Sequence, residues 1–417
     1  MPLAVFADAN GDIRESGRLA MSARSGRNSV VPDLADLIPL PEGSDFFVLP
    51  GRLPVGHDKR GNRVPISAPA GESALAVAAF MPPAHTATLL ADFEKLPDAP
   101  NLPLFAYSAL GWGDGRFWVA GFRSDDDPRQ ELGRYHPALI EKTTNILLRK
   151  NSKNRLIQHL GKCCLSYNCP AAVNYFMGRF EAPLPTSPSC NARCLGCISL
   201  QASGCCPSTQ ERLKFTPTAR EICEVAAPHL ERTGHVVSFG QGCEGEPLLA
   251  AGTIEEAIGA IRKKTARGTI NLNSNASRPE AVSRLAEAGL DSLRVSMNSA
   301  RKDCHNRYYR PSDFSLDDVM ESIRVMKRRK KFVSLNYFIL PGFTDTEAEY
   351  LALADLLSDC QPDLIQLRNL NMDPDWYLDE VIPEGDETAM GIRNWLTRLK
   401  KSFPRLRFGY FNPPLNR

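Results

Sequence analysis

The chain has 417 residues, of which 43% are hydrophobic, and its 50 Lys and Arg residues nearly balance its 48 Asp and Glu residues, giving a formal net charge of +2. This length suffices for one large domain with an appendage, or for two to three domains. The near-neutral charge argues against a broad nucleic-acid surface, no apolar run is long enough to span a bilayer, and no secretory signal is recognised.

Residues 1–140 are expected to form a separate, β-rich and partly irregular domain. Strand-like runs recur at Phe46–Leu49, Leu75–Phe80 and Phe117–Phe122, and turn clusters such as Ser124–Pro128 separate them. This region contains no catalytic motif that we recognise. We expect it to cover the rest of the protein, and a role in substrate recognition is the alternative.

Residues 141–180 show a helical pattern and are expected to connect this domain to the next one. They carry Cys163, Cys164 and Cys169. The spacing of these thiols matches no metal motif that we recognise. A structural role and a role as cluster ligands therefore both stay open.

A cysteine loop follows a proline-punctuated segment at residues 183–188. Cys190, Cys194 and Cys197 have the spacing Cys-x3-Cys-x2-Cys. Thiolates are soft ligands for zinc or for an iron–sulfur cluster, and three of them would leave the fourth iron of a [4Fe–4S] cluster open. The alternative is a buried stripe at positions i, i+4 and i+7 of a helix, but the prolines and Gly196 argue against a helix.

After the cysteine loop, strand-like and helix-like segments alternate up to residue 375. This alternation predicts an α/β fold with a parallel sheet, namely a partial (β/α)6 TIM-type barrel over 181–375, followed by a C-terminal helix and strand extension over 376–417. The expected strands are His235–Gly240, Thr269–Asn273, Ser292–Met297, Phe332–Phe338 and Leu364–Leu370, with an extended segment before Cys190 as the first. The expected helices are Pro217–Ala227 with Thr216 as N-cap, Thr253–Lys263, Arg278–Ala288, Ser315–Arg329, Asp345–Asp359 and Glu387–Lys401.

Polar residues gather where the predicted strands end. A glycine-rich turn after the second strand contains Glu246, an anionic acceptor suited to an ammonium group. Strands five and six direct further polar residues inward, and these are either substrate-facing or part of a satisfied internal network. They are Asn336, Gln366, Arg368 and Asn369.

The cysteine loop, the turn Gly245-Glu246-Pro247 and the partial barrel together resemble the radical S-adenosylmethionine (radical SAM) superfamily, over about residues 180–375. The resemblance implies that Cys190, Cys194 and Cys197 hold a [4Fe–4S] cluster whose open iron binds S-adenosylmethionine. It also implies that an electron from the cluster cleaves this cofactor to a 5′-deoxyadenosyl radical, which abstracts a hydrogen atom from a substrate. No side chain is assigned a catalytic role.

The resemblance assigns cofactor-binding residues position by position. Gly245 and Glu246 match the turn that receives the methionine amino group, and Asn273 matches the segment that ends the third strand. The remaining matches are Ser296 and Asn298, for ribose or carboxylate, and Arg310 or Arg307, for the carboxylate, with a surface ion pair as the alternative for each arginine.

Two positions depart from the pattern of the superfamily. Glu244 stands where the first of two paired glycines is usual, and Gly196 stands where an aromatic residue often lies near adenine. Tyr337 or Phe338 is therefore expected to cover the adenine.

A second iron–sulfur cluster is a further hypothesis, because nine cysteines remain outside the loop. The spacing of these cysteines matches no auxiliary domain that we recognise. The candidate ligands are Cys164, Cys169, Cys205, Cys206 and Cys243.

The sequence therefore predicts a cytoplasmic radical SAM enzyme that modifies a substrate, with a peptide or protein side chain favoured. The resemblance implies an external electron donor such as ferredoxin or flavodoxin. Alternatives are modification of a small metabolite or an RNA base, although the weak net charge argues against RNA. A non-catalytic protein that binds zinc or an iron–sulfur cluster, or carries clusters for transfer, is the alternative of a different class.

Overall fold

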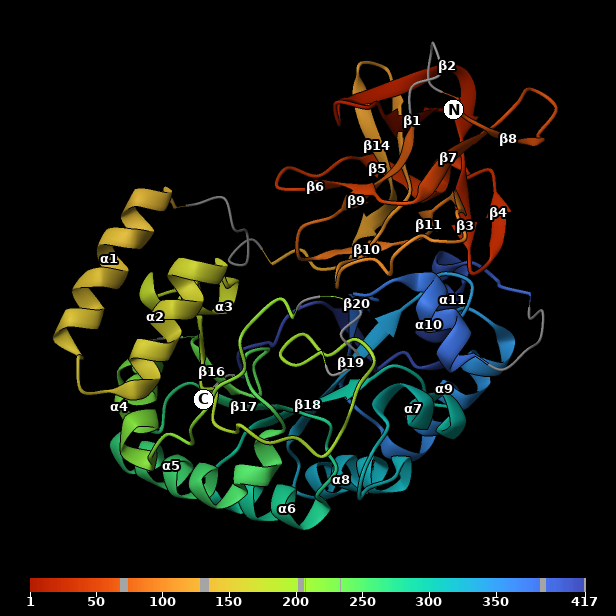
Figure 1. The fold of residues 1–417 in the computed structure, drawn as a ribbon. Helices are drawn as coiled ribbons and strands as arrows, with labels where there is room; N and C mark the ends of the chain where they lie inside the picture. The colour runs from red at the N-terminus through yellow and green to blue at the C-terminus, as the bar shows by residue number, and fades with distance from the viewer. Residues whose placement is uncertain are drawn as a thin grey trace.

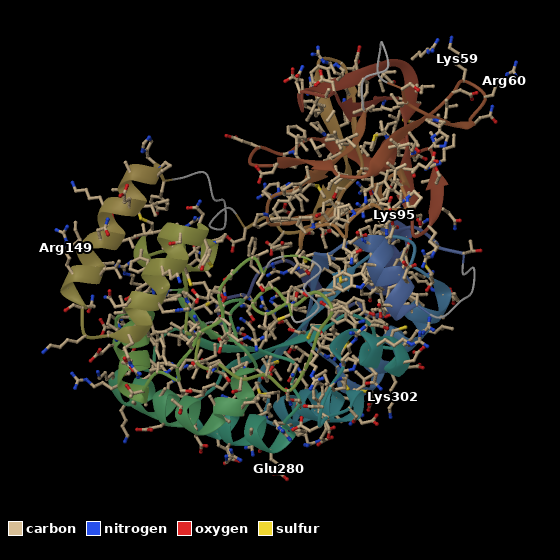
Figure 2. All side chains as sticks on the ribbon, in the orientation of Figure 1. Lys59, Arg60, Lys95, Arg149, Glu280 and Lys302 are labelled. Atoms are coloured by element: carbon tan, nitrogen blue, oxygen red, sulfur yellow. The ribbon has the colours of Figure 1, made fainter. Side chains whose placement is uncertain are left out.

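The computed structural model describes residues 1–67, 74–127, 135–201, 206, 208–232, 234–382 and 388–415. It contains an N-terminal antiparallel β domain, a group of three helices and an α/β body (Figure 1). Charged side chains such as those of Lys59, Arg149 and Glu280 project outward at its periphery (Figure 2). No helix in the described part of the chain is long and apolar enough to cross a bilayer.

The N-terminal domain is built from antiparallel strands. Within the described residues, these strands form an 11-stranded sheet and a 3-stranded sheet. The three runs expected to be strands lie in β6, β9 and β14. The strands are β1 (Leu3–Ala7), β2 (Ile13–Met21), β3 (Ala23–Ser25), β4 (Asn28–Val30), β5 (Leu37–Pro39), β6 (Asp45–Leu49), β7 (Arg52–His57), β8 (Arg63–Pro65), β9 (Leu75–Phe80), β10 (His85–Ala87), β11 (Leu90–Ala91), β12 (Phe93–Lys95), β13 (Leu110–Gly113) and β14 (Arg116–Arg123), with a 3-10 turn at Leu34–Asp36.

Three helices connect this domain to the α/β body. They are α1 (Pro137–Lys150), α2 (Arg155–Tyr167) and α3 (Pro170–Phe176). The side chain of Asn154 caps α2 by accepting from the N–H of Ile157, and Asn168 ends α2 in the left-handed conformation. One face of α2, including Leu156, Leu160 and Cys163, is buried against the body.

The α/β body is a partial TIM barrel, as the sequence predicted. Its strands are all parallel and lie in the order of the sequence, which requires a crossover between each pair. Figure 1 shows helices along the outside of this sheet. The strands are β15 (Glu181–Pro183), β16 (Val236–Phe239), β17 (Thr269–Ser274), β18 (Ser292–Met297), β19 (Phe332–Ile339), β20 (Leu364–Asn369) and β21 (Arg407–Gly409). The helices are α4 (Ala219–Leu230), α5 (Ala251–Lys264), α6 (Pro279–Ala288), α7 (Lys302–Tyr309), α8 (Leu316–Arg328), α9 (Glu347–Cys360), α10 (Pro374–Val381) and α11 (Ile392–Ser402), with a 3-10 turn at Pro247–Ala250.

The body differs from the expectation in several details. Helices α7 and α10 are not expected from the sequence, and the strand expected in the C-terminal extension, β21, pairs in parallel with β20 as a seventh strand of the described sheet. Helix α4 begins at Ala219, because Thr218 and Glu221 form a capping box, and it continues through Pro228. Thr216 is therefore not the N-cap. The expected start of the last helix, Glu387, lies outside the described residues.

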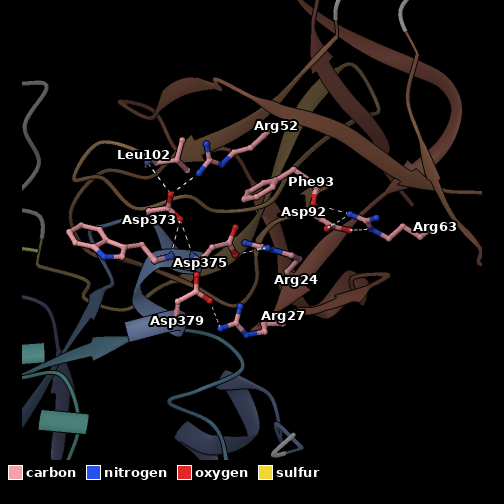
Figure 3. A network of polar contacts seen from close by, with 11 residues as sticks. Arg24, Arg27, Arg52, Arg63, Asp92, Phe93, Leu102, Asp373, Asp375 and Asp379 are labelled. Atoms are coloured by element: carbon pink, nitrogen blue, oxygen red, sulfur yellow. Dashed lines mark hydrogen bonds and ion pairs between the residues drawn. The ribbon is translucent and has the colours of Figure 1, made fainter. Parts of the chain in front are cut away.

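The N-terminal domain packs against the barrel through buried ion pairs (Figure 3). Arg52 Nη2 lies 2.7 Å from Asp373 Oδ2, and both side chains are fully buried. Arg24 Nη1 lies 2.8 Å from Asp375 Oδ1, also away from solvent. Arg27 and Asp379 form a third pair at 2.7 Å, but there both side chains are more than half exposed.

A buried histidine pair in the body leads to a prediction on acid stability. Burial lowers the pKa of His229 from 6.5 to about 3, and His235 Nδ1 lies 3.2 Å from its Nε2. The unfolded chain takes up this proton near pH 6.5 while the folded protein does not, so stability is lost as the pH falls below that value. Between pH 8 and pH 5 we expect the free energy of unfolding to fall by about 2 kcal/mol because of His229.

Urea unfolding at pH 8, 6.5 and 5 measures this effect. The His229→Gln variant should lose stability less steeply on acidification than the wild type. His136→Gln, at an exposed histidine, is the matched control and should keep the wild-type slope. Equal slopes for all three proteins would contradict the prediction.

Candidate functional site

The three cysteines of the loop line one cavity of about 430 Å³. Strand ends line the same cavity, including Ser274 at the end of β17 and Asn369 at the end of β20. The cavity therefore lies at the carboxyl ends of the strands, where barrels of this type carry their sites. Phe80, Met81 and Ala106 of the N-terminal domain complete the lining.

The cysteine loop is irregular and is held by backbone hydrogen bonds. Residues 190–199 form no helix, so the alternative of a buried helical stripe is wrong. Arg193 and Leu195 donate their N–H groups to the carbonyls of Tyr309 and Tyr308, at 2.9 and 3.1 Å. The loop is thereby fixed to the end of α7.

The environment of the thiols is low in polarity, and one cation lies among them. Burial raises the pKa of Cys190 to about 11 and that of Cys194 well above its ordinary value. Arg212 places Nη2 3.5 Å from the sulfur of Cys197 and Nε 3.1 Å from the hydroxyl oxygen of Ser199. Sequence reasoning missed Arg212, because the stretch around it carries no periodic pattern.

The turn at Gly245 and Glu246 lies directly against the segment that precedes the cysteines. Gly245 N donates to Ser187 O at 2.7 Å, and Glu246 N donates to Ser189 O at 2.8 Å. A Cβ atom at Gly245 would lie 2.0 Å from Ser189 O, so only glycine fits here.

The carboxylate of Glu246 lines the cavity and is buried. It accepts hydrogen bonds from Ser274 Oγ at 2.5 Å, Asn275 N at 2.9 Å and Leu248 N at 3.0 Å. Burial raises its pKa to about 7. A carboxylate can accept about four hydrogen bonds, so one further donor could be accommodated.

Glu244 joins two segments of the site through four backbone hydrogen bonds. One carboxylate oxygen accepts from Thr186 N at 2.7 Å and Ser187 N at 2.9 Å. The other accepts from Gly240 N at 2.7 Å and Gln241 N at 2.8 Å. Burial raises the pKa of Glu244 to about 7, and the four N–H groups act against this rise. The residue that departs from the usual glycine pair thus helps to hold the turn of Gly245 and Glu246 in place.

The inner part of the cavity carries two arginines from neighbouring regions of the barrel. Burial and, to a smaller extent, the charge of Arg368 lower the pKa of Arg294 to about 9. The Nε atom of each of these two arginines has no hydrogen-bond partner among the residues that the structure describes. Arg368 stacks on the ring of Tyr410, at 3.9 Å from its centroid.

Most other polar side chains near the inner part of the cavity form hydrogen bonds to one another. Asn412 Nδ2 donates to Glu181 Oε1 at 2.9 Å, and Gln366 Nε2 donates to Asn412 Oδ1 at 2.9 Å. Asn273 Nδ2 and Asn336 Oδ1, in the cavity lining, have no partner among the described residues. The cavity therefore offers unbonded donors and acceptors next to two cations.

The structure brings most of the predicted site residues to this cavity. The lining includes Cys190, Cys194, Cys197, Gly245, Glu246, Asn273 and Ser296, together with Asn336, Arg368 and Asn369. Asn369 also bonds to β10, because Ala87 N donates to its Oδ1 at 2.8 Å. Gln366 is fully buried below the lining.

Asn298 and Arg310 do not line the cavity. Asn298 is fully buried and donates to Tyr377 Oη at 3.1 Å and to Cys304 O at 3.2 Å. Arg310 forms an exposed ion pair with Glu380 at 2.8 Å, which is the alternative that the sequence left open. Arg307 is exposed as well.

Among the aromatic candidates for the adenine, Phe338 lines the cavity and Tyr337 does not. Tyr337 is buried on the other face of β19, where its hydroxyl bonds to Glu349. Tyr308 also lines the cavity, and a Cβ at Gly196 would lie 3.1 Å from its hydroxyl oxygen. Tyr308 thus occupies the space beside Gly196.

The cysteines proposed for a second cluster do not assemble as one set. Cys164 contacts Thr144 of α1, at 3.4 Å between sulfur and oxygen. Cys206 is buried in an apolar group with Leu195. Cys169 lies at the start of α3, Cys243 lies near Cys163, and Cys205 lies outside the described residues.

Comparisons with known proteins agree with this arrangement. Residues 184–354 match the family model of the Radical SAM superfamily. No match was found among curated proteins.

Several solved structures resemble the chain at low identity. The FeFe-hydrogenase maturase HydG from Carboxydothermus hydrogenoformans is 15% identical with a TM-score of 0.38, and the match covers 65% of this chain and 69% of that chain. A radical SAM methyltransferase from Sphaerobacter thermophilus is 14% identical with a TM-score of 0.39, over 55% of this chain and 65% of that chain. SuiB from Streptococcus suis, bound to S-adenosylmethionine, is 12% identical with a TM-score of 0.40, over 68% of each chain.

Proposed function

Because this chain belongs to the radical SAM superfamily through residues 184–354, we propose that it cleaves S-adenosylmethionine reductively and uses the resulting radical to modify a substrate that carries an anionic group. Enzymes of this superfamily use a [4Fe–4S] cluster and S-adenosylmethionine. The observation that carries the proposal is the joint placement of three loop thiols and two arginines in one cavity.

The residues present fit these two cofactors. Cys190, Cys194 and Cys197 offer three thiolates on an irregular loop at one cavity, which leaves one position of a cube for another ligand. The bound cluster would supply the electron that cleaves the cofactor to a 5′-deoxyadenosyl radical. Glu246 is suited to the amino group, and Asn273 offers an unbonded amide nitrogen.

The rest of the lining orients ligands and excludes water. Phe338 and Tyr308 provide apolar ring surfaces, on which a base can pack. Phe80, Met81 and Ala106 close the cavity from the N-terminal domain, which limits the access of water to reactive groups.

The anionic substrate is inferred from Arg294 and Arg368. Glu244 and Glu246, the acidic residues of the lining, direct their hydrogen bonds to other groups, and the charge of Glu181 offsets the environment of Arg294 only in part, since the pKa of Arg294 stays lowered to about 9. A carboxylate is the natural partner of two guanidinium groups. We favour an acidic peptide or protein side chain that enters the cavity. A small carboxylic acid is the second candidate, and the modest volume of about 430 Å³ under a covering domain favours it.

We also propose a cytoplasmic location with ferredoxin or flavodoxin as electron donor. Cluster-ligating thiols must stay reduced, which the cytoplasm provides. The net charge of +2 supports a substrate other than RNA.

The test of cofactor cleavage is 5′-deoxyadenosine formation after anaerobic reconstitution with iron and sulfide. With dithionite and S-adenosylmethionine, the wild type should form the product, and the triple Cys190, Cys194, Cys197→Ala variant should form none. Cys360→Ala, at a buried cysteine between α9 and α8, is the control and should remain active. Zinc uptake without sulfide, or equal product from the triple variant, would refute the proposal.

The Arg368→Gln variant distinguishes two anions that could pair with the arginines of the cavity. One belongs to the substrate, and the other is the methionine carboxylate of the cofactor. If the substrate provides it, the Kd for S-adenosylmethionine and product formation without substrate should stay within about twofold of the wild type. If the cofactor provides it, loss of a charge-assisted hydrogen bond should weaken binding by about tenfold or more. The second result would refute the anionic substrate while leaving cofactor cleavage intact.

A further inference from the structure

A second group of metal-ligating side chains lies outside the cavity. His159, Cys163 and Cys243 each place one ligand atom within 4.8 Å of the others. His159 and Cys163 are one turn apart on the same face of α2, and Cys243 comes from the loop that follows β16. Residues 80 positions apart in the chain thus meet at one point.

The distances in this group fit a single ion. The sulfur of Cys163 lies 3.6 Å from His159 Nε2. A tetrahedral zinc ion, with Zn–S of about 2.3 Å and Zn–N of about 2.0 Å, separates its ligand atoms by about 3.5 to 3.8 Å. A [4Fe–4S] cube binds each cysteine through a different iron and so holds its ligand atoms farther apart. The cluster proposed from the sequence is therefore a poorer occupant than one ion.

The surroundings also fit such a site. Cys163 and Cys243 are 1% and 3% exposed, whereas His159 is partly exposed, which gives an ion a path from solvent. Cys169 lies at the same end of α2, because its N–H donates to Cys163 O at 3.1 Å. Its sulfur does not belong to the group of ligand atoms within 4.8 Å of one another, so we expect a water molecule as the fourth ligand.

We propose that His159, Cys163 and Cys243 bind one structural zinc-type divalent ion. The thiols release their protons to solvent as the ion binds, and no oxidation or reduction occurs. Two thiolates and one imidazole are a ligand set that zinc prefers.

The ion ties α2 to the loop that builds the cavity. Gly242 and Glu244, on either side of Cys243, line that cavity, and Cys243 O accepts a hydrogen bond from Leu213 N at 2.7 Å. Metal binding itself does not depend on the proposed function. Only its consequence, a fixed cofactor turn at Gly245 and Glu246, rests on that function.

The experiment is metal analysis of the full chain, purified without chelators, with the cluster loop intact or replaced. The wild type and the triple Cys190, Cys194, Cys197→Ala variant should both hold about one zinc per chain. If the triple variant retains zinc, the zinc does not bind at the cysteine loop. The zinc proposal and the proposal of cofactor cleavage can therefore fail independently of each other.

Single substitutions locate the ion. His159→Ala, Cys163→Ser and Cys243→Ser should each lower zinc content to a small fraction of the wild-type value. Cys164→Ser is the matched control, because this buried neighbour of Cys163 contacts Thr144 instead, and it should retain zinc. Cobalt substitution of the wild type gives a readout that needs no variant, since thiolate-bound tetrahedral cobalt has intense visible absorption.

Three results would overturn the proposal. The first is wild-type zinc content in the Cys163→Ser and Cys243→Ser variants. The second is a triple variant that still contains iron and sulfide and loses both when Cys163 is also replaced. That result would indicate a cluster at this site. The third is a metal-free protein in which mass spectrometry finds a Cys163–Cys243 disulfide.

Discussion

Replacement of Asp373 by Asn should destabilise the protein by about 3–5 kcal/mol, because it leaves the charge of Arg52 buried without an anionic partner. The two side chains are 0% exposed and form an ion pair at 2.7 Å (Figure 3). Asp373 Oδ2 also accepts from Leu102 N at 2.9 Å, and Oδ1 accepts from Asp375 N at 3.0 Å. Urea unfolding at neutral pH measures the loss.

The exposed pair of Arg27 and Asp379 at the same interface provides a matched control. Both side chains are more than half exposed, so Asp379→Asn should cost less than about 1 kcal/mol. An Arg52→Met, Asp373→Leu double variant should recover much of the stability lost by the single one, because no buried charge remains. Equal losses for Asp373→Asn and Asp379→Asn would show that burial does not set the energy of this contact.

Replacement of Glu244 by Gln should both destabilise the protein and abolish most cofactor cleavage. A carboxylate accepts all four backbone N–H groups, whereas the amide presents an NH₂ group to two of them. Two buried donors lose their acceptor, at about 1–3 kcal/mol each. The side chain then holds only one of its two segments, residues 186–187 or residues 240–241, so the cofactor site should loosen.

Urea unfolding and 5′-deoxyadenosine formation together test this prediction. Glu256→Gln on the exposed face of α5 is the control and should change the free energy of unfolding by less than about 0.5 kcal/mol. A Glu244→Gln variant with wild-type stability and wild-type product formation would show that the four hydrogen bonds are not needed for the turn.

Local patterns predicted the parts of the site that depend on neighbouring residues. The three cysteines and the glycine turn carry their chemistry within short segments, and strand alternation directs Asn336 and Arg368 to the inside. The capping box Thr218-x-x-Glu221 was also present in the sequence, and Glu221 would have identified Thr218 over Thr216.

Other features depend on contacts that no local pattern encodes. The sequence predicts a strand in the C-terminal extension, but β21 has only three residues, too few to show alternation, so its place in the sheet is defined by its pairing with β20. The meeting of His159 and Cys243 requires the packing of α2 against the barrel. Arg310 carries no signal that would distinguish a cofactor ligand from a surface ion pair, since Glu380 is 70 positions away.

The pairing of Arg52 with Asp373 bears on how the chain is made. Synthesis proceeds from the N-terminus, and the two residues are 321 positions apart. At about 5–20 residues per second, roughly 15 to 65 s pass between their appearances at the ribosome. The strands of the N-terminal domain, complete at Arg123, emerge well before α10 exists. Throughout that interval Arg24 and Arg52 lack their carboxylate partners, and only contacts within the N-terminal domain, such as those of Arg52 with Pro50 O and Pro100 O, can hold them.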